Sequence, residues 1–359
     1  MMLWGIPLVS NSPIDPSYHE EIDRWLSKCS DAGVSRIIGG DGTRVLTELA
    51  NLKDIDVHPY LGCTAFPRHG RSKIDYLWSM EFLRPSLDMP LARDILDDHR
   101  PVWDAPKVST TITDFAALHP EYRSLTRDRS YILQKGQDLY LSLDFPEVRK
   151  ELTSRFLEQL NQTDATGIQF EFVLGDEDKN GVVTYGYEDS LVRQFQANHG
   201  RSPFEIPNDD PDWVKFRAGY VTRYLVELRK EIKERQPETV FSTTIIAGEP
   251  GDYINGLQDW QEWINQDAID EFHLWFRTNS NLGDLERHMK HIVEVIDGRC
   301  DIVAELSCYH PGSFQDPGLL LEAGQVAKAS GADKVGVYKN QAVEQLGLWD
   351  VVEKLSLLN

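Results

Sequence analysis

The sequence predicts a single (β/α)8 barrel domain that spans residues 1–359. Short apolar runs with strand-like alternation recur along the chain and are separated by helix patterns, which favours parallel strands joined by right-handed crossovers. We count eight such units. Because no G-x-G-x-x-G motif follows the first run, a closed barrel is favoured over a doubly wound sheet.

The strands and helices are expected in strict alternation. A helix at 16–32 carries an apolar stripe and ends at Gly33, and the helix after 144 begins with Pro146 and Glu147, which are typical of a first turn. The expected strands are 3–9, 35–40, 57–64, 167–173, 240–247, 271–277, 301–309 and 334–339. The expected helices are 16–32, 45–51, 144–162, 188–198, 211–235, 257–265, 282–297, 317–330 and 341–357.

Residues 65–143 break this alternation and form a long insertion after the third strand. The region is rich in proline and charge and contains Trp78 and Trp103. A structureless loop of this length would be unusual. We therefore expect a partly helical cover over the barrel mouth with a short strand at 107–113, or else a peripheral subdomain that does not contact substrate. An extended polar loop is also expected at 175–189, after the fourth strand.

Charge and composition exclude several classes of partner. The net charge of −21 disfavours nucleic acid and anionic membranes, and it suits a neutral or cationic substrate or a saline habitat. No apolar run approaches the roughly 20 residues of a membrane span. The N-terminus shows no signal peptide, which predicts a cytoplasmic protein unless a leader was removed. The four cysteines lack metal-site spacing, so reduced thiols are expected. The sequence does not indicate an oligomeric state.

Two carboxylates carry the main catalytic hypothesis. Alternation places Glu171 on the interior face of the fourth strand, near its C-terminal end, and places Glu305 in the same way on the seventh strand. In a barrel that end is the catalytic face. Glycoside hydrolysis needs such a pair, so Glu171 is the candidate general acid/base and Glu305 the candidate nucleophile of a retaining enzyme. Alternatively, each Glu forms an interior ion pair with Arg or Lys.

Aromatic and polar residues near the strand ends are candidates for sugar binding. On the sixth strand His273, Trp275 and Arg277 alternate inward, and an inward Trp can stack on a sugar, although core filling is the competing role. The remaining candidates lie on or after other strands, or in the insertion: Asp41, Arg44, Tyr60, Trp103, Tyr309, Tyr338 and Asn340.

The acidic run Asp176, Asp178, Asn180 and Gly181 matches the first half of a calcium loop. The twelfth position holds Tyr187 rather than Glu, so a structural calcium site and a plain acidic turn both remain open. Catalysis by two carboxylates requires no cofactor.

Two other functions remain open at this stage. A metal-dependent barrel hydrolase could use Asp41, His58 and His273, and metal content of the purified protein would discriminate it. A barrel that binds a glycan without cleaving it is the second, and binding without turnover would reveal it.

Three blocks of the sequence resemble a known family. Residues 115–123 (FAALHPEYR), 143–149 (LDFPEVR) and 167–172 (GIQFEF) resemble the HPEW, hPEVR and DGIxxD blocks of the glycoside hydrolase-like family 10 group. The resemblance extends over about residues 110–235 and implies a barrel that acts on carbohydrate. Tyr122 replaces the usual Trp, and Glu171 the usual Asp. The two Glu positions are similar to those of retaining barrel glycosidases, with Phe170 where Asn commonly precedes the acid.

Overall fold

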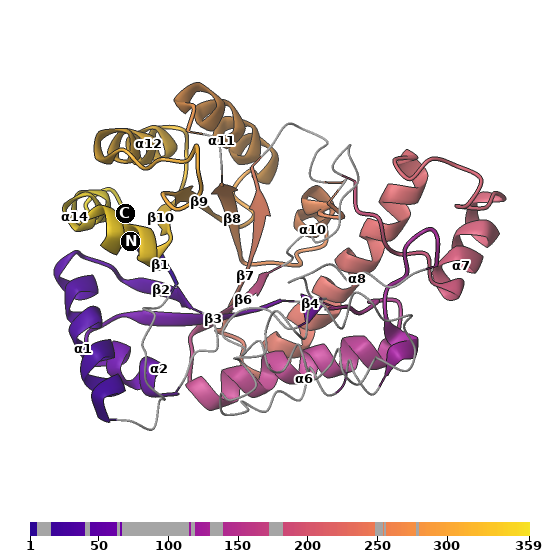
Figure 1. The fold of residues 1–359 in the computed structure, drawn as a ribbon, viewed down its shortest axis with the longest axis horizontal. Coiled ribbons are helices and arrows are strands. Elements are labelled where there is room, and N and C mark those ends of the chain that lie inside the picture. The colour runs from indigo at the N-terminus through magenta and orange to yellow at the C-terminus, as the bar shows by residue number, and fades with distance from the viewer. Residues whose placement is uncertain are drawn as a thin grey trace, which may run out of the picture.

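A computed structural model describes residues 1–5, 16–39, 44–62, 65–66, 115, 119–129, 139–171, 182–247, 254, 256–277 and 280–359. Eight parallel strands close into a barrel in the order β1-β10-β9-β8-β7-β6-β3-β2 (Figure 1). The predicted (β/α)8 barrel is therefore confirmed. The strands are β1 Met2–Trp4, β2 Arg36–Gly39, β3 Asp56–Gly62, β6 Gly167–Glu171, β7 Val240–Ile246, β8 Glu271–Phe276, β9 Asp301–Ser307 and β10 Lys334–Tyr338.

Helices surround the barrel, and the two chain ends meet beside β1 (Figure 1). Several helices begin where the sequence places a proline after an aspartate. Asp210 accepts hydrogen bonds from two backbone amides of the first turn of α8, and Asp316 caps α12 in the same way. The helices are α1 Pro16–Asp31, α2 Arg44–Asn51, α6 Pro146–Thr163, α7 Asp189–His199, α8 Pro211–Arg235, α10 Trp260–Asn265, α11 Leu282–Ile296, α12 Pro317–Ala329, α13 Asn340–Leu346 and α14 Trp349–Ser356.

The last predicted helix is wrong in one respect. The single helix expected at 341–357 is two helices, because Gly347 adopts φ +64° and ends α13 in the left-handed conformation. The following residue, Leu348, is buried and begins the turn into α14.

The main hydrophobic core lies between the barrel and the helices. Alternate residues of the strands face outward into it, whereas their neighbours face the barrel interior. The predicted alternation is confirmed on three strands, whose outward residues are Ile168 and Phe170, then Phe272, Leu274 and Phe276, then Ile302, Ala304 and Leu306. The interior therefore holds most of the buried polar side chains of these strands.

The insertion follows β3 as expected. Strand β3 pairs directly with β6, with Tyr60 opposite Gln169, so the residues between them contribute no strand to the barrel order. A two-residue antiparallel pair, β4 (Ala65–Phe66) and β5 (Leu139–Tyr140), brings the two ends of the insertion together. The 107–113 strand predicted within it, together with Trp78 and Trp103, lies outside the described residues.

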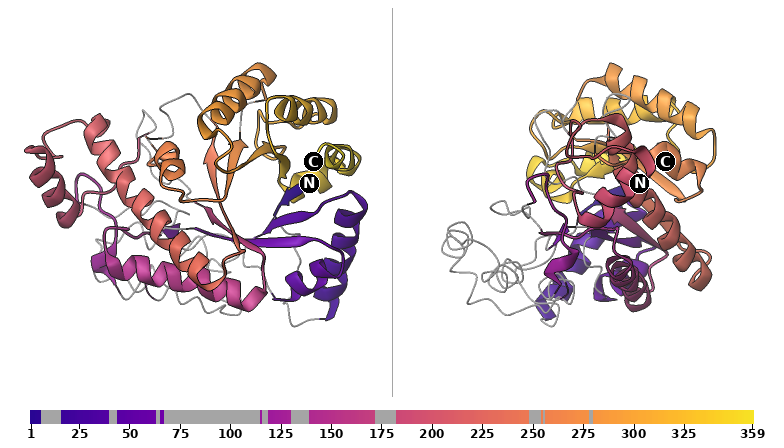
Figure 2. Two further views of the ribbon diagram at one scale, coloured as in Figure 1. Left: turned by 180° about the vertical axis from the view of Figure 1, so that it is seen from behind. Right: turned by 90° about the vertical axis from the view of Figure 1, so that its right-hand side faces the viewer.

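Helix α7 and one end of α8 extend beyond the barrel (Figure 2). This lobe has its own small core of Tyr187, Leu191, Phe195, Trp213 and Tyr220. Arg217 is buried at its base and donates to the carbonyl oxygens of Val183 and Tyr185, at 2.7 Å each. The lobe is thus tied to the segment that follows the β6 loop.

Candidate active site at the barrel mouth

The two predicted catalytic carboxylates lie on β6 and β9, which two other strands, β7 and β8, separate in the barrel. Glu305 is the fifth residue of β9 and is only 1% exposed. Glu171 is the last residue of β6, opposite Gly62 of β3, and its side chain is outside the described part of the structure. Gln169, two residues earlier, is buried and donates to Thr244 of β7 at 2.5 Å. The inward position of Glu171 and the carboxyl separation stay predictions.

A buried ion network lies on the N-terminal side of Glu305. The ring of His273 contacts two carboxylates: its Nε2 is 2.9 Å from Glu271 Oε1 and its Nδ1 is 3.6 Å from Glu305 Oε2. Glu271 in turn binds Arg36 at 2.8 Å and Lys334 at 2.5 Å. Arg36, Glu271 and Lys334 are the first residues of β2, β8 and β10. Together with His273 they form a network of alternating charges that ends at Glu305.

The pKa values follow from this arrangement. Burial alone would lower the pKa of His273, but the bonds to Glu271 and Glu305 outweigh it and raise that pKa. Burial would raise the pKa of Glu271, yet His273, Arg36 and Lys334 hold it well below its usual range. His273 is therefore an imidazolium that places a positive charge beside Glu305.

The other barrel histidine has the opposite character. Burial is the largest cause that lowers the pKa of His58, which therefore remains neutral. Its ring lies against the backbone of Gly167, where an added Cβ would come within 2.2 Å of the ring. His58 and His273 thus have separate partners. Within the described ranges no group of three or more His, Cys, Asp or Glu side chains is arranged to hold a metal ion.

Aromatic rings surround the barrel interior at the level of Glu305. Trp4 of β1 lies 5.5 Å from Tyr60, 5.7 Å from Tyr338 and 6.4 Å from His273, measured between ring centroids. Trp275 lies 4.7 Å from Tyr338 and is the register partner of Glu305 on the neighbouring strand. The indole Nε1 atoms of both tryptophans are buried and have no hydrogen-bond partner among the described residues. They are donors that an oxygen-rich ligand could satisfy.

The structure brings together six of the predicted binding residues: Tyr60, His273, Trp275, Arg277, Tyr309 and Tyr338. It adds Trp4 and His310, which the sequence reasoning did not select. Trp4 could have been found, because it has the inward parity of a first barrel strand. His310 lies three residues after the end of β9, and nothing in its local pattern marks it.

Other candidates lie elsewhere or outside the described residues. Arg44 is exposed at the start of α2 and pairs with Glu48 at 2.7 Å. Asn340 is buried, and its side-chain oxygen accepts a hydrogen bond from Trp25 of α1 at 2.8 Å, so it joins the barrel to its outer layer. Asp41, Trp103 and the calcium-like residues Asp176, Asp178 and Asn180 fall outside the described residues.

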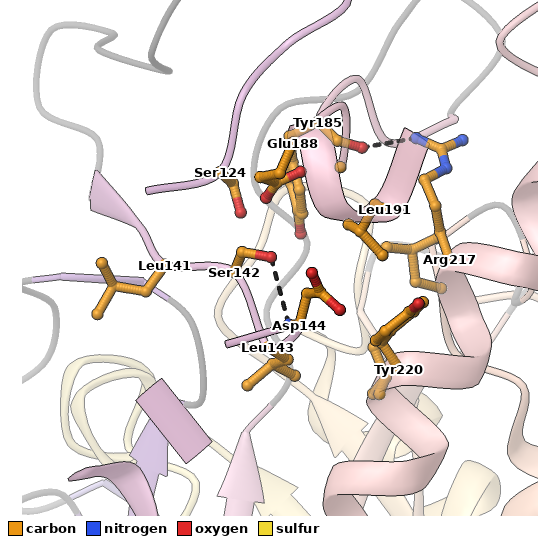
Figure 3. A pocket seen from close by; sticks show the side chains of 13 residues that line it. Ser124, Leu141, Ser142, Leu143, Asp144, Tyr185, Glu188, Leu191, Arg217 and Tyr220 are labelled. Atoms are coloured by element: carbon orange, nitrogen blue, oxygen red, sulfur yellow. Dashed lines mark hydrogen bonds between the residues drawn. The ribbon is translucent and has the colours of Figure 1, made fainter. Parts of the chain in front are cut away.

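A second, smaller pocket lies between the insertion and the α7–α8 lobe (Figure 3). Glu188, the residue before α7, is 3% exposed within it, and its carboxyl group lies beside Ser124 and Ser142. Burial raises the pKa of Glu188 to about 7, and the two serine hydroxyls and its own backbone amide lower it only in part. The hydroxyls are near, but no contact to either carboxylate oxygen has hydrogen-bond geometry. The sequence reasoning identified Glu188 only as a helix start.

Three comparisons relate the chain to known proteins. The profile of the family described as Glycosyl hydrolase-like 10 matches residues 105–296. Among curated proteins, none matches the chain. The fold is similar to that of the PgaB (BpsB) glycoside hydrolase domain from Bordetella bronchiseptica, with 13% identity, a TM-score of 0.60, and coverage of 98% of this chain and 97% of that one.

Two β-galactosidases share the barrel. The enzyme from the Antarctic haloarchaeon Halorubrum lacusprofundi is 13% identical with a TM-score of 0.62, and 99% of this chain covers 58% of it. The enzyme from Bacillus circulans sp. alkalophilus is 12% identical with a TM-score of 0.62, over 99% of this chain and 55% of that one. The chain thus spans a little over half the length of these enzymes, and the likeness shows the fold alone. No helix in the described part of the chain is long and apolar enough to cross a membrane.

Proposed function

We propose, from the premise that this chain belongs to the glycosyl hydrolase-like 10 family, that it hydrolyses a glycosidic bond of an oligo- or polysaccharide with retention of configuration. Glu305 is the nucleophile and Glu171 the general acid/base. The observation that carries the proposal is the environment of Glu305, a buried carboxylate beside an imidazolium. Two nearby indole groups have no hydrogen-bond partner among the described residues.

His273 supports the role of Glu305 as nucleophile. A nucleophilic carboxylate must be ionised, and burial at 1% exposure would oppose ionisation. The positive charge of His273, 3.6 Å away, opposes that effect. Arg36 and Lys334 hold Glu271 ionised, and Glu271 in turn holds the proton on His273. The positive charge of His273 thus favours the ionised form of Glu305.

The reaction then proceeds in two steps. A Glu305 oxygen bonds to the anomeric carbon as the bond to the leaving oxygen breaks, and Glu171 gives its proton to that oxygen. In the second step Glu171 takes a proton from water, the water oxygen bonds to the anomeric carbon, and the bond to Glu305 breaks. The rings of Trp4, Trp275 and Tyr338 line the space where the sugar would sit and offer faces for stacking.

The test is a pair of isosteric variants on a panel of aryl glycosides and polysaccharides. Glu305→Gln and Glu171→Gln should each lower kcat by orders of magnitude with little change in thermal midpoint, whereas Glu353→Gln, at an exposed position on α14, should not. In Glu305→Ala, added azide should restore turnover and give a glycosyl azide of inverted configuration. Near-wild-type turnover in Glu305→Gln would contradict the proposal, and so would an inverted product from wild type.

The distance between the two carboxyl groups provides a second test. If Glu305 is the nucleophile, its carboxyl group should lie about 5–5.5 Å from that of Glu171 in a crystal structure, whereas roughly 6.5–9.5 Å would indicate inversion. Product anomers followed by NMR should agree with the distance. Glycan binding with no product from any substrate would point instead to a binding protein.

A further inference from the structure

Two cationic side chains lie at the mouth beside β8, β9 and β10, although the chain as a whole is strongly negative, at −21. Arg277, the residue after β8, places its guanidinium 5.4 Å from the centre of the Trp275 ring. Lys339, the residue after β10, places its ammonium 4.3 Å from the centre of the Tyr309 ring. Two cations of the barrel mouth thus flank the aromatic group that surrounds Glu305.

The two cations act on the same region of the mouth. His310 stacks on Tyr338 at 5.7 Å and lies 5.6 Å from Trp275. Burial is the largest cause of its lowered pKa, and the charges of Arg277 and Lys339 are the next two. Both charges therefore lie close enough to act on one imidazole.

Neutral ring nitrogens on this side of the mouth also favour an anionic ligand. The Nε1 atoms of Trp4 and Trp275 and the Nε2 atom of His310 are buried without a hydrogen-bond partner among the described residues. Indole groups donate and cannot accept. A neutral sugar presents hydroxyls that both donate and accept, so it needs acceptors from the protein as well. Arg277, Lys339 and the two indole groups can only donate, so they match a ligand group that only accepts, next to the acceptor that Glu305 Oε2 offers.

We propose that the side of the mouth formed by β8, β9 and β10 is a subsite for a sugar residue that carries an anionic group, either a carboxylate or a sulfate ester. Arg277 would bind the anion, since its planar fork suits oxyanions, and Lys339 would add a second charge. Trp275 would pack on the sugar face. This inference rests on the proposed function for the kind of ligand, a glycan, and it specifies which glycans.

The experiment measures binding separately from turnover. Calorimetry with the wild-type chain would use 4-nitrophenyl thioglycosides, which resist cleavage, as matched sets: hexoside, hexuronide and hexoside 6-sulfate of the same configuration and anomer. Oligogalacturonate and hyaluronan fragments would extend the set to longer anionic ligands, with neutral oligosaccharides of equal length beside them. We expect the anionic member to bind about tenfold more tightly than its neutral partner. The preference should shrink as salt is raised.

Variants then locate the preference. Arg277→Gln should reduce the anionic preference from about tenfold to about threefold, and adding Lys339→Gln should abolish it. Arg287→Gln is the matched control, because Arg287 is an exposed arginine on the outer helix α11, where it pairs with Asp284. Thermal midpoints of all three should stay within a few degrees of wild type.

The outcomes separate this inference from the proposed function. Tighter binding of hexuronide than of hexoside 6-sulfate identifies a carboxylate, and the reverse order identifies a sulfate ester. Equal binding of neutral and anionic partners, no binding of any anionic glycan, or a preference unchanged in Arg277→Gln would overturn the inference. Cleavage of neutral O-glycosides would still uphold the proposed function. Anionic binding that depends on Arg277, with no O-glycoside cleaved, would uphold the subsite and contradict the hydrolase.

Discussion

Glu188 should make the stability of this protein depend on pH. Its carboxyl group is buried between the insertion and the α7–α8 lobe, and burial raises its pKa from 4.5 to about 7. The folded chain therefore holds a proton more tightly than the unfolded chain. Glu188 has no effect on the free energy of unfolding below pH 4.5, and it lowers that free energy as pH rises through the interval to about 7. The loss is complete near pH 8.

The size of the effect follows from the same pKa values. At 1.36 kcal/mol per pKa unit, a rise from 4.5 to about 7 corresponds to about 3 kcal/mol. An unfolding entropy of about 2.1 cal/mol/K per residue over 359 residues converts this into a shift of about 4 °C in thermal midpoint. Glu188→Gln keeps the shape and removes the ionisation. The variant should therefore melt about 4 °C above wild type at pH 8.

The assay is calorimetry of both chains at pH 5 and pH 8 in one buffer series. At pH 5 the wild-type carboxyl group is largely neutral, so the two midpoints should nearly coincide. Glu238→Gln, at an exposed position in the turn before β7, should change neither midpoint by more than a degree. The reasoning is refuted if the difference between wild type and Glu188→Gln is the same at both pH values, or if the variant is the less stable chain at pH 8.

Two further predictions concern the barrel interior. Gly167→Ala should destabilise the protein by about 1–3 kcal/mol, because the added Cβ would come within 2.2 Å of the His58 ring. Gly219→Ala on α8 is the control. Its Cβ would meet nothing within 4 Å, so its thermal midpoint should equal or exceed that of wild type. His273→Gln should raise the acidic limb of the pH profile of kcat/KM by about one pKa unit, since it removes a positive charge 3.6 Å from Glu305; an unshifted profile would show that His273 does not set this ionisation.

The barrel could be predicted from the sequence because each strand carries its own evidence. In β8 and β9, residues such as Phe272 and Ile302 alternate with His273 and Glu305, and the pleat alone assigns them to opposite faces. The insertion did not disturb the strand count, because the apolar block at 167–173 is bounded by turn residues. This pattern predicts a strand whatever precedes it. The alternation of apolar and polar residues was therefore sufficient to predict these strands.

The interactions of the site could not be predicted in this way. Arg36 and Glu271 are 235 positions apart in sequence, and they meet because β2 and β8 both begin at the same end of the barrel interior. The sequence reasoning allowed for an interior ion pair at Glu305 itself. The structure places Arg and Lys contacts on the neighbouring acid, Glu271, and His273 lies between the two carboxylates. Which of two nearby acids pairs with a cation depends on barrel register, which no local pattern contains.

Glu188 and Glu305 show why a raised pKa does not by itself locate the reaction. An acid with a pKa near 7 is what a glycosidase needs as a proton donor, and strongly perturbed groups often mark functional sites. The pocket around Glu188, however, has room for only about 40 Å³, enough for a water or two and far below the roughly 300–1,000 Å³ of ligand sites. Its neighbours Leu191 and Tyr220 belong to helices of the lobe, and Ser142 precedes α6. Glu188 therefore joins the lobe to the barrel, and the pocket around it is too small to hold a sugar.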